Sequence, residues 1–143
     1  MASLKECLEN KYLVGNERIA QAIKAANAEE SMENFRAVVS AIQDRMLEDG
    51  HFMLPVVHPN GNPEEFYVRT LRSEAGENFM VAYTSDEEAA KGEPTEILSY
   101  FIDSVLEIAL GMEGIAGMVL DPWGERFVLN RAAIQMVLEA KQC

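Results

Sequence analysis

Apolar residues recur every three or four positions early in the chain, and this spacing predicts two helices. The first covers residues 17–28, and Asn16 is its expected N-cap. The second follows Ser31 and ends at Gly50, and its apolar stripe is the clearer of the two. Residues 2–10 are expected to add a short helical arm.

After Gly50 the pattern changes to short apolar runs separated by turn-forming residues. These runs predict three strands that form an antiparallel meander, at residues 52–57, 65–73 and 79–84. Pro55 has no N–H to donate, so we expect the first of these strands to lie at a sheet edge or to contain a bulge.

The second half of the chain continues with alternating helices and strands. Ser85 opens an S-x-x-E capping box, which predicts a helical turn over residues 85–90. The widest apolar face spans residues 97–110 and predicts a helix. The remaining expected elements are two strands and a final helix, at 115–120, 126–129 and about 130–141.

Asp121-Pro122-Trp123-Gly124 separates the last two strands and has the residues of a tight hairpin turn. Three consecutive apolar residues on each side predict strands that are buried on both faces. We expect the Asp121 carboxylate to cap the turn. For Trp123 two interpretations stay open, a core side chain, which we favour, and an exposed interface anchor.

Together these patterns predict one α+β domain over residues 1–143, with residues 1–16 as an N-terminal arm. The expected sheet has five strands, is mainly antiparallel and packs against helices, in the order α-α-β-β-β-α-β-β-α.

The balance of charges narrows the choice of partners. Lys and Arg total 12 against 24 Asp and Glu, which gives a formal net charge of -12. Such a surface repels nucleic acid and anionic lipid, so we expect no partner of either kind. The N-terminus lacks the apolar core of a signal peptide, and residues 97–110 are too short and too charged to cross a bilayer. We expect a cytoplasmic protein.

Candidate chemistry is sparse. His51 and His58 flank an extended run and lie roughly 23 Å apart, so they cannot share a metal ion. Cys7 and Cys143 stand near opposite ends of the chain. We favour reduced thiols for them, and a disulfide between them stays open as the alternative. Gly111, Gly114 and Gly117 run from a helix into a strand, which is the wrong context for a phosphate loop. We expect no metal and no cofactor.

Three short stretches carry a resemblance to a known family: Phe52 to Val57, then Tyr83-Thr84-Ser85 with Glu87, then Gly117 to Pro122. In this order they resemble the N-terminal domain of the SseB, or "enhanced serine sensitivity", proteins, over roughly residues 17–143. Tyr83 stands where Phe is usual, and Asp121 where Asn is usual. The resemblance implies a small α+β domain without an established enzymatic activity and implies no catalytic residues.

The predicted function is therefore a non-enzymatic, cytoplasmic protein-interaction or regulatory module. Its candidate interaction surface consists of Trp123, Asp121 and Tyr83, and a homodimer is one arrangement it could take. Two alternatives stay open. Small acidic secretion chaperones, which work as dimers, have a similar element order. An enzyme would instead be indicated by a pocket that joins a buried, pKa-shifted residue with His58, Ser85 or Asp121.

Overall fold

The computed structural model describes residues 13–62, 64–92 and 94–142. The helical arm predicted for residues 2–10 and the two cysteines, Cys7 and Cys143, lie outside these residues.

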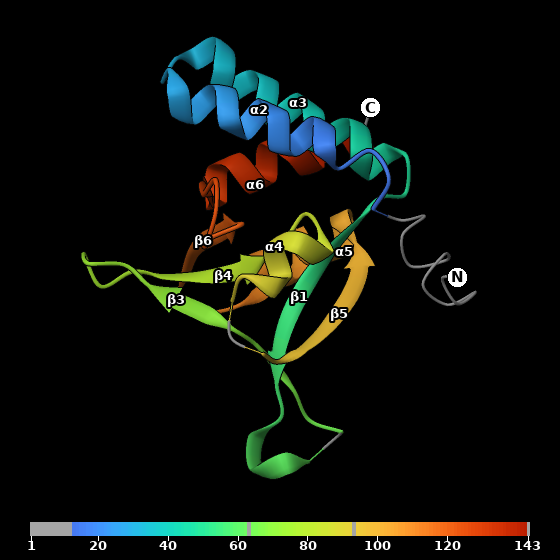
Figure 1. The fold of residues 1–143 in the computed structure, drawn as a ribbon, viewed down its shortest axis with the longest axis vertical. Coiled ribbons are helices and arrows are strands. Elements are labelled where there is room, and N and C mark those ends of the chain that lie inside the picture. The colour runs from blue at the N-terminus through green and yellow to red at the C-terminus, as the bar shows by residue number, and fades with distance from the viewer. Residues whose placement is uncertain (1–12, 63, 93, 143) are drawn as a thin grey trace.

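The two predicted helices are present as α2 (Glu17–Ala28) and α3 (Met32–Leu47). They lie side by side at one end of the molecule (Figure 1). Each buries the predicted apolar stripe, because residues three and four apart share one helix face. The predicted cap of α3 is confirmed, since the Ser31 hydroxyl accepts a hydrogen bond from the Asn34 N–H at 3.0 Å.

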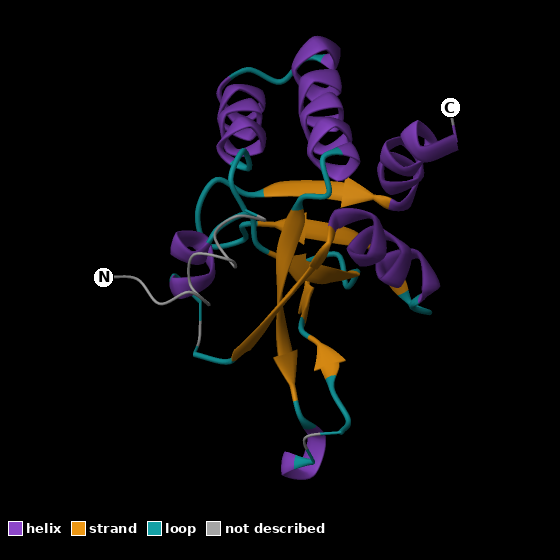
Figure 2. Ribbon diagram, turned by 90° about the vertical axis from the view of Figure 1, so that its right-hand side faces the viewer, coloured by secondary structure: helices purple, strands orange, loops and turns teal. Residues whose placement is uncertain are grey.

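The predicted single five-stranded sheet is wrong, because the strands form two sheets. The first sheet has the order β2-β1-β5, and all of its pairs are antiparallel. Its strands are β1 (His51–Val57), β2 (Tyr67–Val68) and β5 (Glu96–Phe101). A short 3₁₀ turn, η1 (Pro59–Gly61), follows β1 and projects away from α2 and α3 (Figures 1 and 2).

The second sheet has the order β3-β4-β6-β7. Its strands are β3 (Thr70–Arg72), β4 (Asn78–Ala82), β6 (Ile115–Leu120) and β7 (Phe127–Asn130). Strands β4 and β6 are parallel, whereas the other two pairs of this sheet are antiparallel. The predicted antiparallel character is thus confirmed with one exception, and that exception brings the ends of β4 and β6 together.

Pro55 does not mark an edge strand, because β1 is the middle strand of its sheet. On the side away from β5, Met53 bonds with Tyr83, whereas the Pro55 carbonyl accepts from the Arg69 N–H at 2.9 Å. The partner of β1 changes between these two residues. Pro55 therefore stands where a ladder N–H is dispensable, which is how a central strand tolerates it.

The strand predicted over residues 65–73 is divided at Arg69 into β2 and β3, which belong to different sheets. The Arg69 carbonyl accepts from the Val81 N–H at 3.0 Å, while its N–H bonds to Pro55 in the other sheet. One residue thus satisfies its two backbone groups in two sheets, and this joins the sheets into one body.

The helix predicted over residues 97–110 is half wrong. Its first residues form β5, and α5 (Ile102–Gly111) begins only at Ile102. Six residue pairs join β5 to β1, from His51 with Phe101 to Val56 with Glu96. A continuous apolar run fits a strand as well as a helix, so this long-range pairing decides the boundary.

The main core lies between the helices and one face of the second sheet, and it also includes Phe52 and Leu54 from β1. The helices α5 and α6 (Arg131–Leu138) contribute to it, and η2 (Glu139–Gln142) follows α6. A smaller cluster of Val81, Tyr83 and Val119 lies apart from it, packed against Met53 and Ile97 of the other sheet. None of the helices among the described residues is long and apolar enough to cross a bilayer.

The predicted hairpin of β6 and β7 is confirmed. Met118, Val119 and Leu120 are all buried, as expected of a central strand. Burial of β7 on both faces is not confirmed, because β7 is the last strand of its sheet and Val128 is 43% exposed.

Candidate functional site

The strands β4 and β6 run in parallel and end together, and a polar residue stands just past each end. Thr84 follows β4 and Asp121 follows β6. The Asp121 carboxylate accepts from the Thr84 N–H at 2.9 Å through Oδ1, and from the Thr84 hydroxyl at 2.7 Å through Oδ2. Its predicted role as a cap of the following turn is therefore wrong. It joins the ends of two strands that are 37 residues apart in sequence.

The backbone of Asp121 adopts the left-handed conformation, with φ of 51°. Asp and Asn visit this region more readily than other residues that carry a Cβ. The Asp121 N–H still bonds to the Ala82 carbonyl at 3.0 Å, and its carbonyl closes the turn by accepting from the Gly124 N–H at 3.1 Å. A strained residue with a buried carboxylate is a feature that recurs at functional sites.

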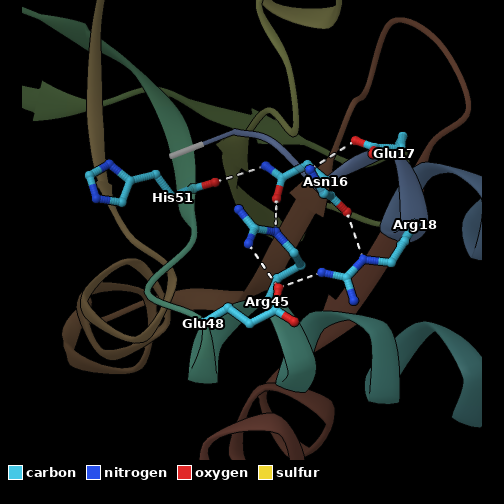
Figure 3. Close-up of polar contacts among 7 residues, drawn as sticks. Asn16, Glu17, Arg18, Arg45, Glu48 and His51 are labelled. Carbon is cyan, nitrogen blue, oxygen red and sulfur yellow. Dashed lines mark hydrogen bonds and ion pairs between the residues drawn. The ribbon is translucent and has the colours of Figure 1, made fainter. Parts of the chain in front are cut away.

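Asn16 is tied to the same place. It occupies the predicted N-cap position of α2, but its side chain makes no capping hydrogen bond there. That side chain instead contacts His51 and Arg45 (Figure 3). Its side-chain amide donates to the carbonyls of His51 and Thr84, both at 2.9 Å. Its side-chain oxygen accepts from Arg45 Nε at 2.8 Å. Asn16 is only 2% exposed, so one side chain holds α3, β1 and the end of β4 together.

An ion pair continues this network to the surface (Figure 3). Arg45 is 4% exposed, and its Nη1 contacts the Glu48 carboxylate at 3.0 Å. Glu48 also pairs with Arg18 of α2. Hydrogen bonds from Arg18 and then from Arg45 lower the pKa of Glu48. The buried guanidinium thus has the polar partners that a buried charge requires.

A cavity of about 440 Å³ opens above Thr84 and Asp121. Asn16, Thr84 and Asp121 line it and are each 3% exposed or less. Burial raises the pKa of Asp121 to about 6, although the two hydrogen bonds from Thr84 oppose this rise and Glu88 nearby adds to it. The carboxylate is therefore still mostly ionised at pH 7 in a largely desolvated place.

A larger groove of about 700 Å³ lies between α2, α3 and β7. Its lining is mainly apolar and includes Met32, Phe35 and Phe127. Buried polar groups that converge on a cavity are a better sign of a binding site than volume alone. The smaller cavity at the strand ends is accordingly the candidate site.

The three residues of the predicted interaction surface differ in their exposure to solvent. Tyr83 and Asp121 are buried, at 4% and 3% exposure, whereas Trp123 is 46% exposed. The favoured core interpretation of Trp123 is therefore wrong. The Trp123 Nε1–H donates to the Tyr83 hydroxyl at 2.9 Å, so the exposed ring is held by a buried partner.

Of the three residues that would indicate an enzyme, two share the cavity. Ser85 and Asp121 both line it, whereas His58 pairs with Glu96 and bonds to the Glu65 carbonyl at 2.9 Å. The Ser85 half of the predicted capping box is confirmed, because its Oγ accepts from the Glu88 N–H at 3.2 Å, whereas the Glu88 carboxylate pairs with Lys91. Ser85 and Asp121 engage other groups, and no hydrogen bond joins them as nucleophile and base.

The other histidine is buried at the start of β1. His51 Nδ1 lies 2.8 Å from the Ser99 hydroxyl, and its ring meets Phe101 edge-on. Burial and then the charge of Arg45 lower the pKa of His51, which favours the neutral ring at pH 7. In the described part of the chain, no three His, Cys, Asp or Glu side chains are grouped as a metal site would need.

Sequence reasoning missed Thr84, Asn16 and Arg45 as parts of one network. A signal was present for the first, because Thr84 stands at the end of one apolar run and Asp121 directly follows another. Ligand sites tend to form where the carboxyl ends of parallel strands meet. This signal could not be interpreted from the sequence alone, because the predicted antiparallel meander did not include the parallel pairing of β4 and β6.

Fold and site thus define a small two-sheet α+β domain whose polar cavity lies at the ends of its parallel strands. The chain belongs to the SseB protein N-terminal domain family, whose model matches residues 19–136. This confirms the resemblance that the sequence showed. Neither the curated proteins nor the solved structures include a match to the chain.

Proposed function

We propose that this chain is a non-enzymatic protein-interaction or regulatory module of the SseB N-terminal type, and that it works in the cytoplasm. Trp123 is the proposed anchor of its partner. The observation that carries the proposal is that Trp123 is 46% exposed while its indole N–H is held by the buried Tyr83 hydroxyl.

An anchored, half-exposed tryptophan suits binding for a physical reason. Tryptophan is enriched among the residues that contribute most to interfaces. A side chain that is already held in one rotamer loses less conformational entropy when a partner binds. Gly92 lies beside the Trp123 ring and the Tyr83 hydroxyl. A Cβ at Gly92 would come within 2.6 Å of Trp123 Nε1 and 2.7 Å of the Tyr83 hydroxyl. The absence of a side chain at Gly92 therefore leaves room for the ring beside the end of α4 (Asp86–Ala90).

The enzyme alternative has one observation in its favour, the raised pKa of Asp121 at the base of a cavity. Two contacts support the non-enzymatic proposal instead. Both Asp121 oxygens accept hydrogen bonds from Thr84, and the Ser85 hydroxyl caps α4. The secretion-chaperone alternative depended on an element order that the fold does not have, so it is not proposed.

Replacing Trp123 with alanine is expected to lower the free energy of unfolding by only about 1 kcal/mol, because half of the ring is already in water. A core tryptophan would lose about 3 kcal/mol or more. Denaturant unfolding of the parent and the variant measures this difference.

The same variant should lose its protein partner. Affinity capture from extract of the native cells, followed by mass spectrometry, compares the parent with Trp123→Ala and Tyr67→Ala. Tyr67 is a matched control because it is an exposed aromatic residue of β2, at 67% exposure. We expect a protein that Tyr67→Ala retains and Trp123→Ala does not. Retention of the same proteins by both variants would count against Trp123 as the anchor.

A further inference from the structure

We propose that the cavity at the ends of β4 and β6 receives a basic side chain, lysine or arginine, of the protein partner, and that the Asp121 carboxylate binds its charged group. This inference rests on the proposed interaction module. It states the chemical class of the partner side chain that enters the cavity.

The cavity is built by segments that are far apart in sequence. The start of α2, the end of β4, the start of α4 and the turn after β6 all contribute to it. Its volume of about 440 Å³ lies within the range of about 300–1,000 Å³ that is typical of ligand cavities. A lysine or arginine side chain therefore fits inside, together with a few water molecules.

Asp121 lines this cavity as a buried charge without a counter-charge. It is 3% exposed, and its hydrogen bonds come from Thr84 alone among the described residues. Lys91, whose charge lowers the pKa of Asp121, is itself paired with Glu88. Each carboxylate oxygen has a second lone pair, so each can accept one more hydrogen bond. A desolvated carboxylate without a cation is unfavourable, and an incoming ammonium or guanidinium group supplies that cation.

The rest of the lining selects for a cation. Four carboxylates besides Asp121 line the cavity, those of Glu17, Glu87, Glu88 and Glu125. Lys24 is the one basic residue of this lining. Like charges along the walls of a cavity focus the electrostatic potential inside it. An anionic group would be repelled, and a neutral one would gain nothing from this field.

The position of Trp123 indicates that the cation belongs to a protein. Asp121 and Trp123 lie two residues apart on the same short turn, one lining the cavity and the other exposed to solvent. A partner that packs on the ring is therefore within reach of the cavity.

The test is an NMR titration of the full chain, labelled with ¹⁵N, with the peptide acetyl-Ala-Ala-Lys-Ala-Ala-amide. We expect saturable shifts of the Thr84, Asp121 and Gly124 amides, and no such shifts when norleucine replaces lysine. Asp121→Asn should weaken peptide binding at least tenfold. Asp86→Asn is the matched control, because it removes the same charge from the exposed first turn of α4, outside the cavity lining, and should bind as the parent does.

A second variant keeps the proposal testable if Asp121→Asn fails to fold. Glu87→Gln with Glu125→Gln changes two exposed residues of the rim and should weaken the peptide by about threefold or more. Absence of saturable binding to the parent, or equal binding by the parent and all of these variants, would overturn the proposal. Binding of free butylamine as tightly as the lysine peptide would overturn the assignment to a protein side chain.

The two proposals fail separately. Trp123→Ala should leave binding of the lysine peptide unchanged, because Trp123 does not line the cavity. A failed peptide titration would therefore leave Trp123 as the anchor, and an unchanged capture by Trp123→Ala would leave the lysine site in place.

Discussion

Replacing Gly117 with alanine is expected to destabilise the domain by about 3 kcal/mol or more, the largest loss that we predict for a single methyl group. Gly117 lies inside β6 and pairs with Asn130 of β7. A Cβ there would lie 2.8 Å from the Asn130 Cα and closer still to the Leu129 carbonyl oxygen. Both obstacles are backbone atoms, so the two strands themselves would have to separate.

Gly111→Ala is the matched control for this prediction. Gly111 is the last residue of α5, and no heavy atom lies within 4 Å of the place where its Cβ would be. Alanine is the better helix former, so this variant should be as stable as the parent or more stable by up to about 1 kcal/mol. Denaturant unfolding of the two variants beside the parent measures both effects. Equal stability of Gly117→Ala and Gly111→Ala would show that β6 and β7 do not approach as closely as described.

Asp121→Asn is expected to stabilise the domain at neutral pH, by on the order of 2–3 kcal/mol. The pKa of Asp121 is raised by burial to about 6 from an ordinary 3.8, so the folded state prefers the protonated form. Between about pH 4 and pH 6 the folded state binds more protons than the unfolded state. The contribution of this group to stability is therefore fully present below about pH 4 and is lost as the pH rises through 6.

An asparagine side chain reproduces the protonated form. Its oxygen can accept from the Thr84 N–H, its amide can donate to the Thr84 hydroxyl, and asparagine tolerates the positive φ of this position. Unfolding of the variant and the parent at several pH values separates this effect from the titration of His51 and His58. We expect the difference in stability to be largest at pH 7 and to vanish near pH 4. A variant that is less stable than the parent at pH 7 would show that the ionised carboxylate stabilises the fold.

Together with the proposed lysine site, this prediction explains why an ionised group occupies that position. The ionised Asp121 carboxylate destabilises the folded chain when the cavity holds no cation. The basic side chain of a partner supplies the missing counter-charge. Stability and function are then in conflict at Asp121, as is common at binding sites. The expected gain in stability and the expected loss of peptide binding should appear in the same variant.

The elements that the sequence predicted well are those fixed by local signals. Helices α2, α3 and α6 follow apolar periodicity, and the caps at Ser31 and Ser85 use hydroxyls that bond three residues ahead. The hairpin after Leu120 follows the turn preference of Asp-Pro-x-Gly. These features depend on neighbours within a few residues, which a pattern along the chain can register.

The features that the sequence did not predict depend on contacts between distant segments. The start of α5 is set by the pairing of β5 with β1, which ends at Phe101 opposite His51, 50 residues earlier in the chain. Asn16 has the residue type of an N-cap, but its amide reaches Thr84, 68 residues away. The contact of Asp121 with Thr84 depends on the parallel pairing of β4 with β6, which has no local pattern.

Contact between Trp123 and a protein partner is the claim on which the proposed function most depends, and site-specific photocrosslinking in the native cells tests it directly. Photoreactive benzoyl-phenylalanine replaces Trp123 in one chain and Tyr67 in another, and both are irradiated under the same conditions. We predict an adduct with one discrete protein from position 123 and no such adduct from position 67. Equal adducts from both positions, or none from position 123, would contradict the claim that this turn binds the partner.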